Sequence, residues 1–545
     1  MRFMDAKVVN EMLELRVKDL AARPPSLSRE ERHTQLRQSL GLETLPPRTA
    51  LNAAVTGSVE RPGYRIDKLV YDSRPGVPVT AHLYVPDDAG RHPVILRPHG
   101  HWPGKKSDPV VQASAIGLVL SGFAVLVVDS PGHSWDLNPQ NGRAAMGTHD
   151  DPFLQMGAPV QGVYAWDLIR GIDYLETRTD VDASRIGITG ESGGATATMY
   201  TFAIEPRIRA AVPVCGMSSL ETNPHNGCLC NHVPGALRLG DRADLLALRA
   251  EDGALFVIGA EDDPEFPRAG HDLTHEKLRR AYRAGRGEHR YRYEIFPYGH
   301  DYNRRMREAA LAFFREHLAG EAARPYAPEP IPLTDGALNP GPANTVPFDH
   351  PELAVQVPSD RPTSTFRELL EKALSEPYPA SFSVEGRLVP WSRYGRLPEL
   401  KPAPFVAIHD HGINPKEAES VELPYAEIDH RLCTYLGLSV GEVFAQILHL
   451  SLPGGPTNWE DKALSGDALT SFVASMKTLM GGGSAGPAPG LVVAEGPVAS
   501  FVANMLKRYR PDIMTEVSHP IVGWEDALRM NQPAIAQPLA KYLAF

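Results

Sequence analysis

Short apolar runs that alternate with helix-like segments dominate the chain between residues 60 and 320. Most of these runs lack polar alternation and are bounded by Gly, Pro or charged residues, which is typical of strands buried on both faces. We expect strands at 64–71, 77–85, 93–96, 124–128, 185–189, 210–214, 254–258 and 291–296. We expect helices at 110–121, 195–204, 273–284 and 304–318. The alternation predicts an α/β fold, with a mostly parallel sheet and helices on both of its faces.

The length of the chain predicts more than one compact unit, because 545 residues are about three times the commonest domain length. Residues 1–55 are charged and have helical apolar spacing, so we expect a helical N-terminal arm. Residues 56–320 carry the α/β pattern. Residues 321–365 are rich in Pro and Gly and are expected to be a surface connector. A second structured unit is expected at 366–545.

The second unit resembles the first in its sequence. Three pairs of segments match in the same order: 93–100 with 404–412, 125–132 with 447–454, and 187–192 with 491–496. Gly496 takes the place of Ser192 in this comparison, and the chain ends before an acid or a His strand could follow. We therefore predict a truncated, non-catalytic copy of the first unit.

Composition excludes several classes of function. The net charge is −11, so no basic surface for nucleic acid or anionic membrane is expected. No apolar run is long enough to span a bilayer, and the first residues lack the apolar core of a secretory signal. Four Cys in this length do not make a disulfide framework. We expect a cytoplasmic protein; a homo-oligomer is left open.

The segment 190–194 reads GESGG and matches the pattern G-x-S-x-G between an expected strand and an expected helix. In this context the Ser sits on a sharp strand-to-helix turn, and the small neighbours permit the strained backbone. The free N–H groups at the start of the helix favour developing negative charge. We predict that Ser192 is a nucleophile.

A Ser hydroxyl needs a base, and the base needs a third group that orients it. In this architecture the partners follow in the order Ser, acid, His. A carboxylate loop with Asp262 and Asp263 follows the expected strand 254–258, and His300 follows the strand 291–296. We predict His300 as the base. Asp263 is preferred as the acid, with Asp262 as the alternative.

The tetrahedral intermediate needs donors for its oxyanion. The backbone N–H of Gly193 is one candidate, because this residue follows the nucleophile. The second donor is expected from the loop after the strand 93–96, and we assign it to His101. Trp102 and Trp135 lie on loops at strand ends and are expected to contact substrate.

Nothing in the sequence calls for a cofactor or a metal. Cys228 and Cys230 stand close together beside His232, but the spacing is too short for a zinc site and no second Cys pair follows. We expect no metal and no cofactor.

Residues 60–320 resemble the α/β-hydrolase superfamily, and within it the branch of acetyl xylan esterases and dienelactone-hydrolase-like proteins. The motifs that carry the resemblance are HGH at 99–101, DLIRGIDYL at 167–175, VDASRIGITGESGG at 181–194, DPEFP at 263–267 and GH at 299–300. The resemblance implies hydrolysis of a carboxylic ester, often an acetyl ester on a carbohydrate, through an acyl-enzyme and without a metal.

Two other functions fit the same motifs. A serine peptidase or amidase would use the same three residues on a related fold. A non-catalytic binding protein could also be built on a hydrolase scaffold, although the order Ser192, Asp263, His300 argues for an enzyme.

Overall fold

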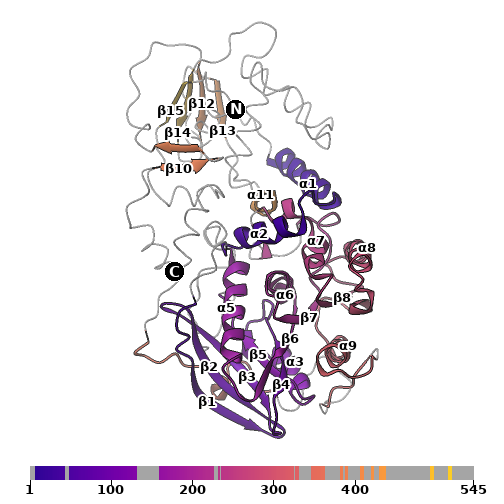
Figure 1. Ribbon diagram of the computed structural model, residues 1–545. Helices are drawn as coiled ribbons and strands as arrows, with labels where there is room; N and C mark the ends of the chain where they lie inside the picture. Colours follow the sequence, from indigo (N-terminus) through magenta and orange to yellow (C-terminus); the bar gives the residue numbers. More distant parts are fainter. Residues whose placement is uncertain are drawn as a thin grey trace.

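The protein is described from a computed structural model (Figure 1). The described residues are 6–42, 48–131, 159–225, 231–233, 235–323, 326–330 and 345–361, with seven short segments at 381–384, 387–390, 405–409, 419–422, 429–436, 491–495 and 514–517. No helix in these ranges is both long and apolar enough to cross a membrane.

A nine-stranded sheet forms the centre of residues 54–296, in the order β1-β2-β3-β5-β4-β6-β7-β8-β9 (Figure 1). The strands are β1 (Ala54–Arg61), β2 (Tyr64–Arg74), β3 (Val77–Pro86), β4 (His92–Leu96), β5 (Ala124–Val128), β6 (Val181–Glu191), β7 (Ile208–Val214), β8 (Ala254–Ala260) and β9 (Tyr291–Phe296). β1, β2, β3 and β5 pair antiparallel, whereas the pairs from β5 to β9 are all parallel. This order of a mostly parallel sheet is that of the α/β-hydrolase fold, so the predicted fold class is confirmed.

Helices cover both faces of the sheet. Successive residues of a strand point to opposite faces, so neighbours in one strand pack against different helices. Val94 and Leu96 join one hydrophobic cluster, whereas Ile95 between them joins the other. α5 (Val160–Leu175), α6 (Gly193–Ile204), α7 (Arg242–Leu246) and α8 (Arg268–Ala284) contribute buried residues to the first cluster. α3 (Pro109–Val119) and α9 (Arg304–Phe314) contribute to the second.

Several elements differ from the expectation, among them α5 and α7, where no helix was expected. β1 was not expected, because its sequence AVTGSVER is polar and it is a half-exposed edge strand. The expected helix 304–318 is divided: α9 ends at Phe314, and a wider helical turn covers Arg315–Ala319. The other expected strands and helices are present, with ends shifted by a few residues.

The N-terminal arm is packed against the sheet's helical layer. It forms α1 (Ala6–Ala22) and α2 (Arg29–Ser39), the second of which starts with a capping box between Ser28 and Glu31. The arm approaches α5 very closely, since a Cβ on Gly162 would lie only 1.8 Å from the carbonyl oxygen of Leu40. The absence of a side chain at Gly162 is therefore what allows this contact.

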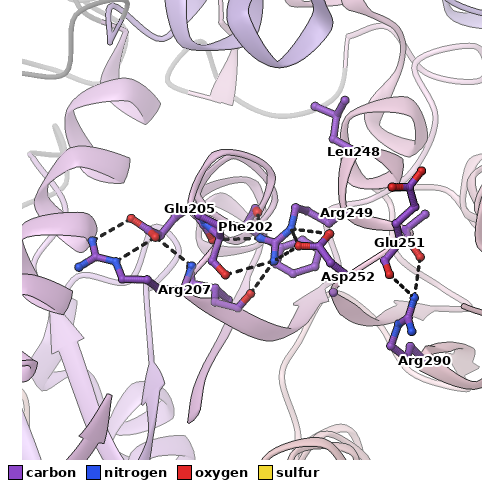
Figure 2. Close-up of polar contacts among 12 residues, drawn as sticks. Phe202, Glu205, Arg207, Leu248, Arg249, Glu251, Asp252 and Arg290 are labelled. Carbon is purple, nitrogen blue, oxygen red and sulfur yellow. Dashed lines mark hydrogen bonds and ion pairs between the residues drawn. The ribbon is translucent and has the colours of Figure 1, made fainter. Parts of the chain in front are cut away.

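The end of α6 is fixed by a buried arginine. Figure 2 shows the guanidinium of Arg249 over the ring of Phe202, 4.7 Å from its centroid. It donates to the carbonyls of Phe202 (2.7 Å), Glu205 (3.0 Å) and Ile208 (2.9 Å). The carbonyls at a helix C-terminus have no partner within the helix, so Arg249 satisfies that of Phe202 in α6 and that of its C-cap residue, Glu205.

A separate four-stranded sheet lies in the C-terminal half, in the order β13-β12-β14-β15. Its strands are β12 (Phe405–His409), β13 (Glu419–Glu422), β14 (Leu491–Glu495) and β15 (Met514–Val517), and all of its pairs are parallel. β12, β14 and β15 thus follow the order and direction of β4, β6 and β7. The matching segment 447–454 and Gly496 lie outside the described residues, and the tandem arrangement stays a prediction.

A short helix of the C-terminal half, α11 (His430–Leu436), contacts the main unit. The ring of Tyr435 stacks on that of His232, with centroids 4.0 Å apart. Nδ1 of His225 lies 2.9 Å from Asp429, just before α11, and its Nε2 lies 3.1 Å from Glu14 of α1. His225 therefore contacts both α1 of the N-terminal arm and the residue just before α11.

Candidate active site

The predicted nucleophile lies on a strained turn between β6 and α6. β6 ends at Glu191, α6 begins at Gly193, and Ser192 between them has φ 55° and ψ −121°. A positive φ is costly for a residue with a side chain and persists only where the surroundings enforce it. The N–H of Ser192 donates to the carbonyl of Val214 (3.0 Å), which holds this turn against β7. The backbone therefore has the shape that a nucleophile elbow requires.

Two glycines of the motif are required because the carbonyl oxygen of Pro98 approaches both of them closely. A Cβ on Gly190 would lie 2.4 Å from the carbonyl oxygen of Pro98, and one on Gly194 would lie 2.6 Å from the same oxygen. The loop after β4 therefore runs directly against the turn that carries Ser192.

Asp263 and His300 meet beyond the ends of β8 and β9. Nδ1 of His300 lies 2.8 Å from Oδ2 of Asp263. Oδ1 of Asp263 accepts the N–H groups of Glu265 (2.9 Å) and Phe266 (3.0 Å), so both carboxylate oxygens have partners. Of the two aspartates left open by the sequence, it is Asp263 that contacts His300, whereas Asp262 is exposed.

The three predicted residues lie at one edge of the sheet. β6, β8 and β9 belong to its parallel part, so Ser192, Asp263 and His300 all follow the carboxyl ends of strands. Ligands of α/β sheets bind outside these ends. The charge of Glu191, beside Ser192, also acts on His300.

The ring of His300 is fixed by two neighbours, Phe266 and Asp263. It stacks on the ring of Phe266, with centroids 5.6 Å apart. Burial opposes protonation of the ring, but the hydrogen bond to Asp263 and the charge of that carboxylate outweigh burial and raise the pKa of His300.

The predicted oxyanion loop lies beside Ser192. A Cβ on Gly100 would be 3.2 Å from the Cβ of Ser192, and one on Gly193 would be 3.1 Å from Cε1 of His101. The structure thus brings His101 and Gly193 together. Trp102, predicted to contact substrate, directs its indole N–H to Oε1 of Glu191.

A buried charge pair supports the other side of this loop. Nζ of Lys106 lies 2.5 Å from Oδ2 of Asp129, and both side chains are fully buried. Burial alone would raise the pKa of Asp129, but the Lys106 ammonium keeps it below its usual value. Nε2 of His99, on the same loop, accepts the N–H of Ser130 (3.2 Å).

Sequence reasoning missed several residues of this region. Asn231 lies 3.4 Å from the position of a Cβ on Gly193 and accepts a hydrogen bond from Gln161 (3.3 Å). Arg97 reads in the sequence as the polar end of a strand, yet it is fully buried and paired with Glu191. Its position at a strand's carboxyl end was the available signal. Trp135, Cys228 and Cys230 lie outside the described residues.

Cys215, Asp263 and His300 are the one group of three metal-ligand types found close together in the described part of the chain, with ligand atoms within 4.8 Å. Burial raises the pKa of the Cys215 thiol well above its usual value, and its Sγ lies 3.4 Å from the carbonyl of Asp301, to which it donates. A thiol binds zinc as the thiolate. Asp263 and His300 already hold each other directly, so the arrangement suits proton transfer better than metal binding.

Comparison with known proteins finds a family that resembles part of this site. Residues 46–219, which include the turn with Ser192 and the loop with His101, match the family of acetyl xylan esterases. Over this segment the chain is similar to acetyl xylan esterases. The predicted family resemblance is thereby confirmed over residues 46–219.

The individual relatives have low sequence identity to this chain. YtaP of Bacillus subtilis (strain 168), which bears the provisional name of a hydrolase, is 24% identical over 306 residues, 53% of this chain and 100% of YtaP. Methylesterase BT1017 is 23% identical to this chain. The match covers 58% of this chain and 69% of BT1017, with a TM-score of 0.46. Acetyl xylan esterase 1 from Thermoanaerobacterium sp. JW/SL YS485 is 17% identical to this chain. The match covers 55% of this chain and 97% of that esterase, with a TM-score of 0.37.

Proposed function

We propose that the chain is a serine carboxylic-ester hydrolase that works through an acyl-enzyme. The observation that carries the proposal is the hydrogen bond between Asp263 and His300 at the sheet edge where Ser192 occupies a strained strand-to-helix turn. A nucleophile, a base and a group that orients the base are the parts that this chemistry needs.

In the first half of the reaction, Oγ of Ser192 attacks the ester carbonyl while Nε2 of His300 takes its proton. Asp263 orients the ring through Nδ1 and stabilises the imidazolium. The N–H groups of Gly193 and His101 bind the oxyanion. The carbonyl then re-forms, the bond to the alcohol oxygen breaks, and His300 returns the proton to the leaving alcohol.

In the second half, water replaces the alcohol. His300 takes a proton from the water as its oxygen attacks the acyl carbon, and the same two N–H groups bind the oxyanion again. The bond to Oγ of Ser192 breaks, His300 returns the proton to Oγ, and the carboxylic acid is released.

The proposed substrates are short acyl esters, foremost acetyl esters on carbohydrates. Support for this class comes from the match of residues 46–219 to the acetyl xylan esterases. We propose no metal and no cofactor, because Asp263 and His300 supply the activation that Ser192 needs.

The test is the Ser192→Ala variant assayed with p-nitrophenyl acetate and with acetylated xylo-oligosaccharides. We expect turnover to fall at least about 10³-fold in the variant, since the nucleophile is lost. Ser121→Ala is the matched control, because the Ser121 hydroxyl donates to Gly117 in α3, away from the site. Activity of Ser192→Ala near that of the control would overturn the proposal.

A fluorophosphonate separates an enzyme from a binding protein. Stoichiometric modification of Ser192, read by mass spectrometry of the digested protein, is expected of a serine hydrolase. An unmodified Ser192 would indicate a binding protein on a hydrolase scaffold. Release of acetate from the sugars, compared with hydrolysis of acetyl-peptide amides, tests the ester preference.

A further inference from the structure

A buried carboxylate links the nucleophile turn to the loop expected to hold the oxyanion. Glu191 directly precedes Ser192, and its side chain is almost completely buried. Its Oε1 accepts the N–H of Gly100 (3.3 Å) and the indole N–H of Trp102. One oxygen of Glu191 therefore holds two residues that flank His101.

The other oxygen of Glu191 pairs with a buried arginine. Oε2 lies 2.5 Å from Nη2 of Arg97, whose side chain is fully buried. Burying two charges is costly unless the pair is well placed, and such pairs are weak evidence for a gain in stability. The pair of Arg97 and Glu191 is therefore better explained by the geometry that it imposes on the site than by a gain in stability.

Arg97 is itself fixed on several sides. Its Nε donates to Oγ of Ser114 in α3 (2.9 Å), and its Nη1 donates to the carbonyl of Pro98 (2.6 Å). Its guanidinium lies over the ring of Tyr302, 5.2 Å from the centroid. Arg97 is thus held rigidly and sets the position of the Glu191 carboxylate.

We propose that Glu191 is a positioning residue, which holds the 98–102 loop so that the N–H of His101 faces the oxyanion formed at Ser192. This inference rests on the proposed function. Glu191 binds the N–H of Gly100, which is the first anchor of the loop. Trp102 serves as the second anchor of the loop.

The bonds of Glu191 explain why the loop needs anchoring. An oxyanion donor acts only when it lies about 2.7–3.1 Å from the developing charge, so a small displacement of the loop removes its effect. Asp129 and Lys106 hold the chain just beyond the loop, and Glu191 holds Gly100 and Trp102 within it. The loop is therefore fixed before substrate arrives, and its donor needs no reorganisation during the reaction.

The test uses the full chain with Glu191→Ala, Glu191→Gln, Trp102→Phe and the double variant Glu191→Ala with Trp102→Phe. Kinetics with p-nitrophenyl acetate give kcat and KM. The inhibition constant of a trifluoromethyl ketone reports the oxyanion site, because its adduct with Ser192 carries the same oxyanion. Glu329→Gln is the control, since Glu329 forms a buried pair with Arg307 (2.8 Å) outside the site.

We expect Glu191→Ala to lower kcat by about 10²-fold, the size of losing one oxyanion donor, and to weaken ketone binding in parallel. KM should stay within about twofold, because ground-state binding does not use this donor. Glu191→Gln, which keeps an acceptor oxygen, should recover about tenfold of the loss. The double variant should be no worse than Glu191→Ala, because Trp102 acts through Glu191.

Three results would overturn the inference: unchanged kcat and ketone binding in Glu191→Ala, additive effects in the double variant, or equal losses in the Glu329→Gln control. If Glu191→Ala does not fold, Trp102→Phe decides, with losses in kcat and in ketone binding that exceed any change in KM as the expected result. The wild-type protein separates this inference from the proposed function, because an inactive wild type with unmodified Ser192 refutes the function itself.

Discussion

Nδ1 of His300 and Oδ2 of Asp263 lie 2.8 Å apart, although 37 residues separate them in the chain. The second oxygen of Asp263 is occupied by two backbone N–H groups of its own loop. The carboxylate therefore cannot turn away from His300 without breaking these bonds, and the ring is held in the tautomer with its proton on Nδ1.

Replacing Asp263 by Asn should lower kcat for p-nitrophenyl acetate by about 10³–10⁴-fold, because the amide favours the wrong tautomer of His300. Asp262→Asn is the matched neighbour, since Asp262 is exposed and follows the same strand. We expect its kcat to stay within about twofold of wild type. Equal losses in both variants, or a loss only in Asp262→Asn, would contradict the assignment of Asp263.

Activity should rise with pH, because the base must be neutral to take the proton of Ser192. Asp263 raises the pKa of His300 above its ordinary value of 6.5, so the midpoint of the kcat/KM profile should lie above 6.5. In Asp263→Asn the carboxylate is absent and burial remains, so the residual activity should have its midpoint below 6.5. A midpoint that does not move between the two proteins would argue against His300 as the titrating base.

Stability should fall in mild acid because of buried histidines. Burial lowers the pKa of His82 to about 3 and of His99 and His271 to about 4, from 6.5. As the pH falls from about 6.5 towards 4, the unfolded chain binds protons that the folded chain does not. Each such histidine should reduce the free energy of unfolding by about 1.4 kcal/mol per pH unit.

Urea unfolding between pH 7.5 and 4.5 measures this slope. His271→Asn removes one of the buried groups and should make the slope shallower, whereas His289→Asn, at an exposed position, should leave it unchanged. An identical slope in wild type and His271→Asn would show that His271 does not take part.

The Arg249→Lys variant should destabilise the fold by about 2–4 kcal/mol, because an ammonium cannot replace the fork that serves the carbonyls of Phe202, Glu205 and Ile208. Figure 2 shows Arg290 close by, bonded to the carbonyl of Glu251 (2.6 Å). Arg290→Lys is the control and should cost under about 1 kcal/mol. Arg249 lies at the end of α6 opposite to Ser192, so kcat of the folded variant should not change.

The fold was predictable from sequence where burial is strongest. The runs that became β4, β5 and β8 are apolar and buried throughout, so their pattern alone marks them as strands. β1 was missed because a half-exposed edge strand carries polar residues that resemble a loop. The strand ends were shifted because the apolar pattern stops before the backbone pairing does.

The site was predictable to the level of loops and not of contacts. The motif around Ser192 contains its own local signal, since the glycines and the strand before them are adjacent in sequence. The choice between Asp262 and Asp263 has no such signal, because neighbouring side chains on one loop point in different directions. The bond of Glu191 to Gly100 spans 91 residues, and only the sheet order brings them together.

The packing of the N-terminal arm has a consequence for the order in which the chain folds. Nζ of Lys277 donates to the carbonyl of Ala21 (2.5 Å) across 256 residues, and Nε of Arg29 donates to that of Leu248 (2.8 Å) across 219. At roughly 5–20 residues per second, synthesis needs about 13–50 s to make Lys277 after Ala21. The arm is synthesised early, but it can dock only after the residues that it contacts have been made. Its helices therefore complete the main unit late in folding.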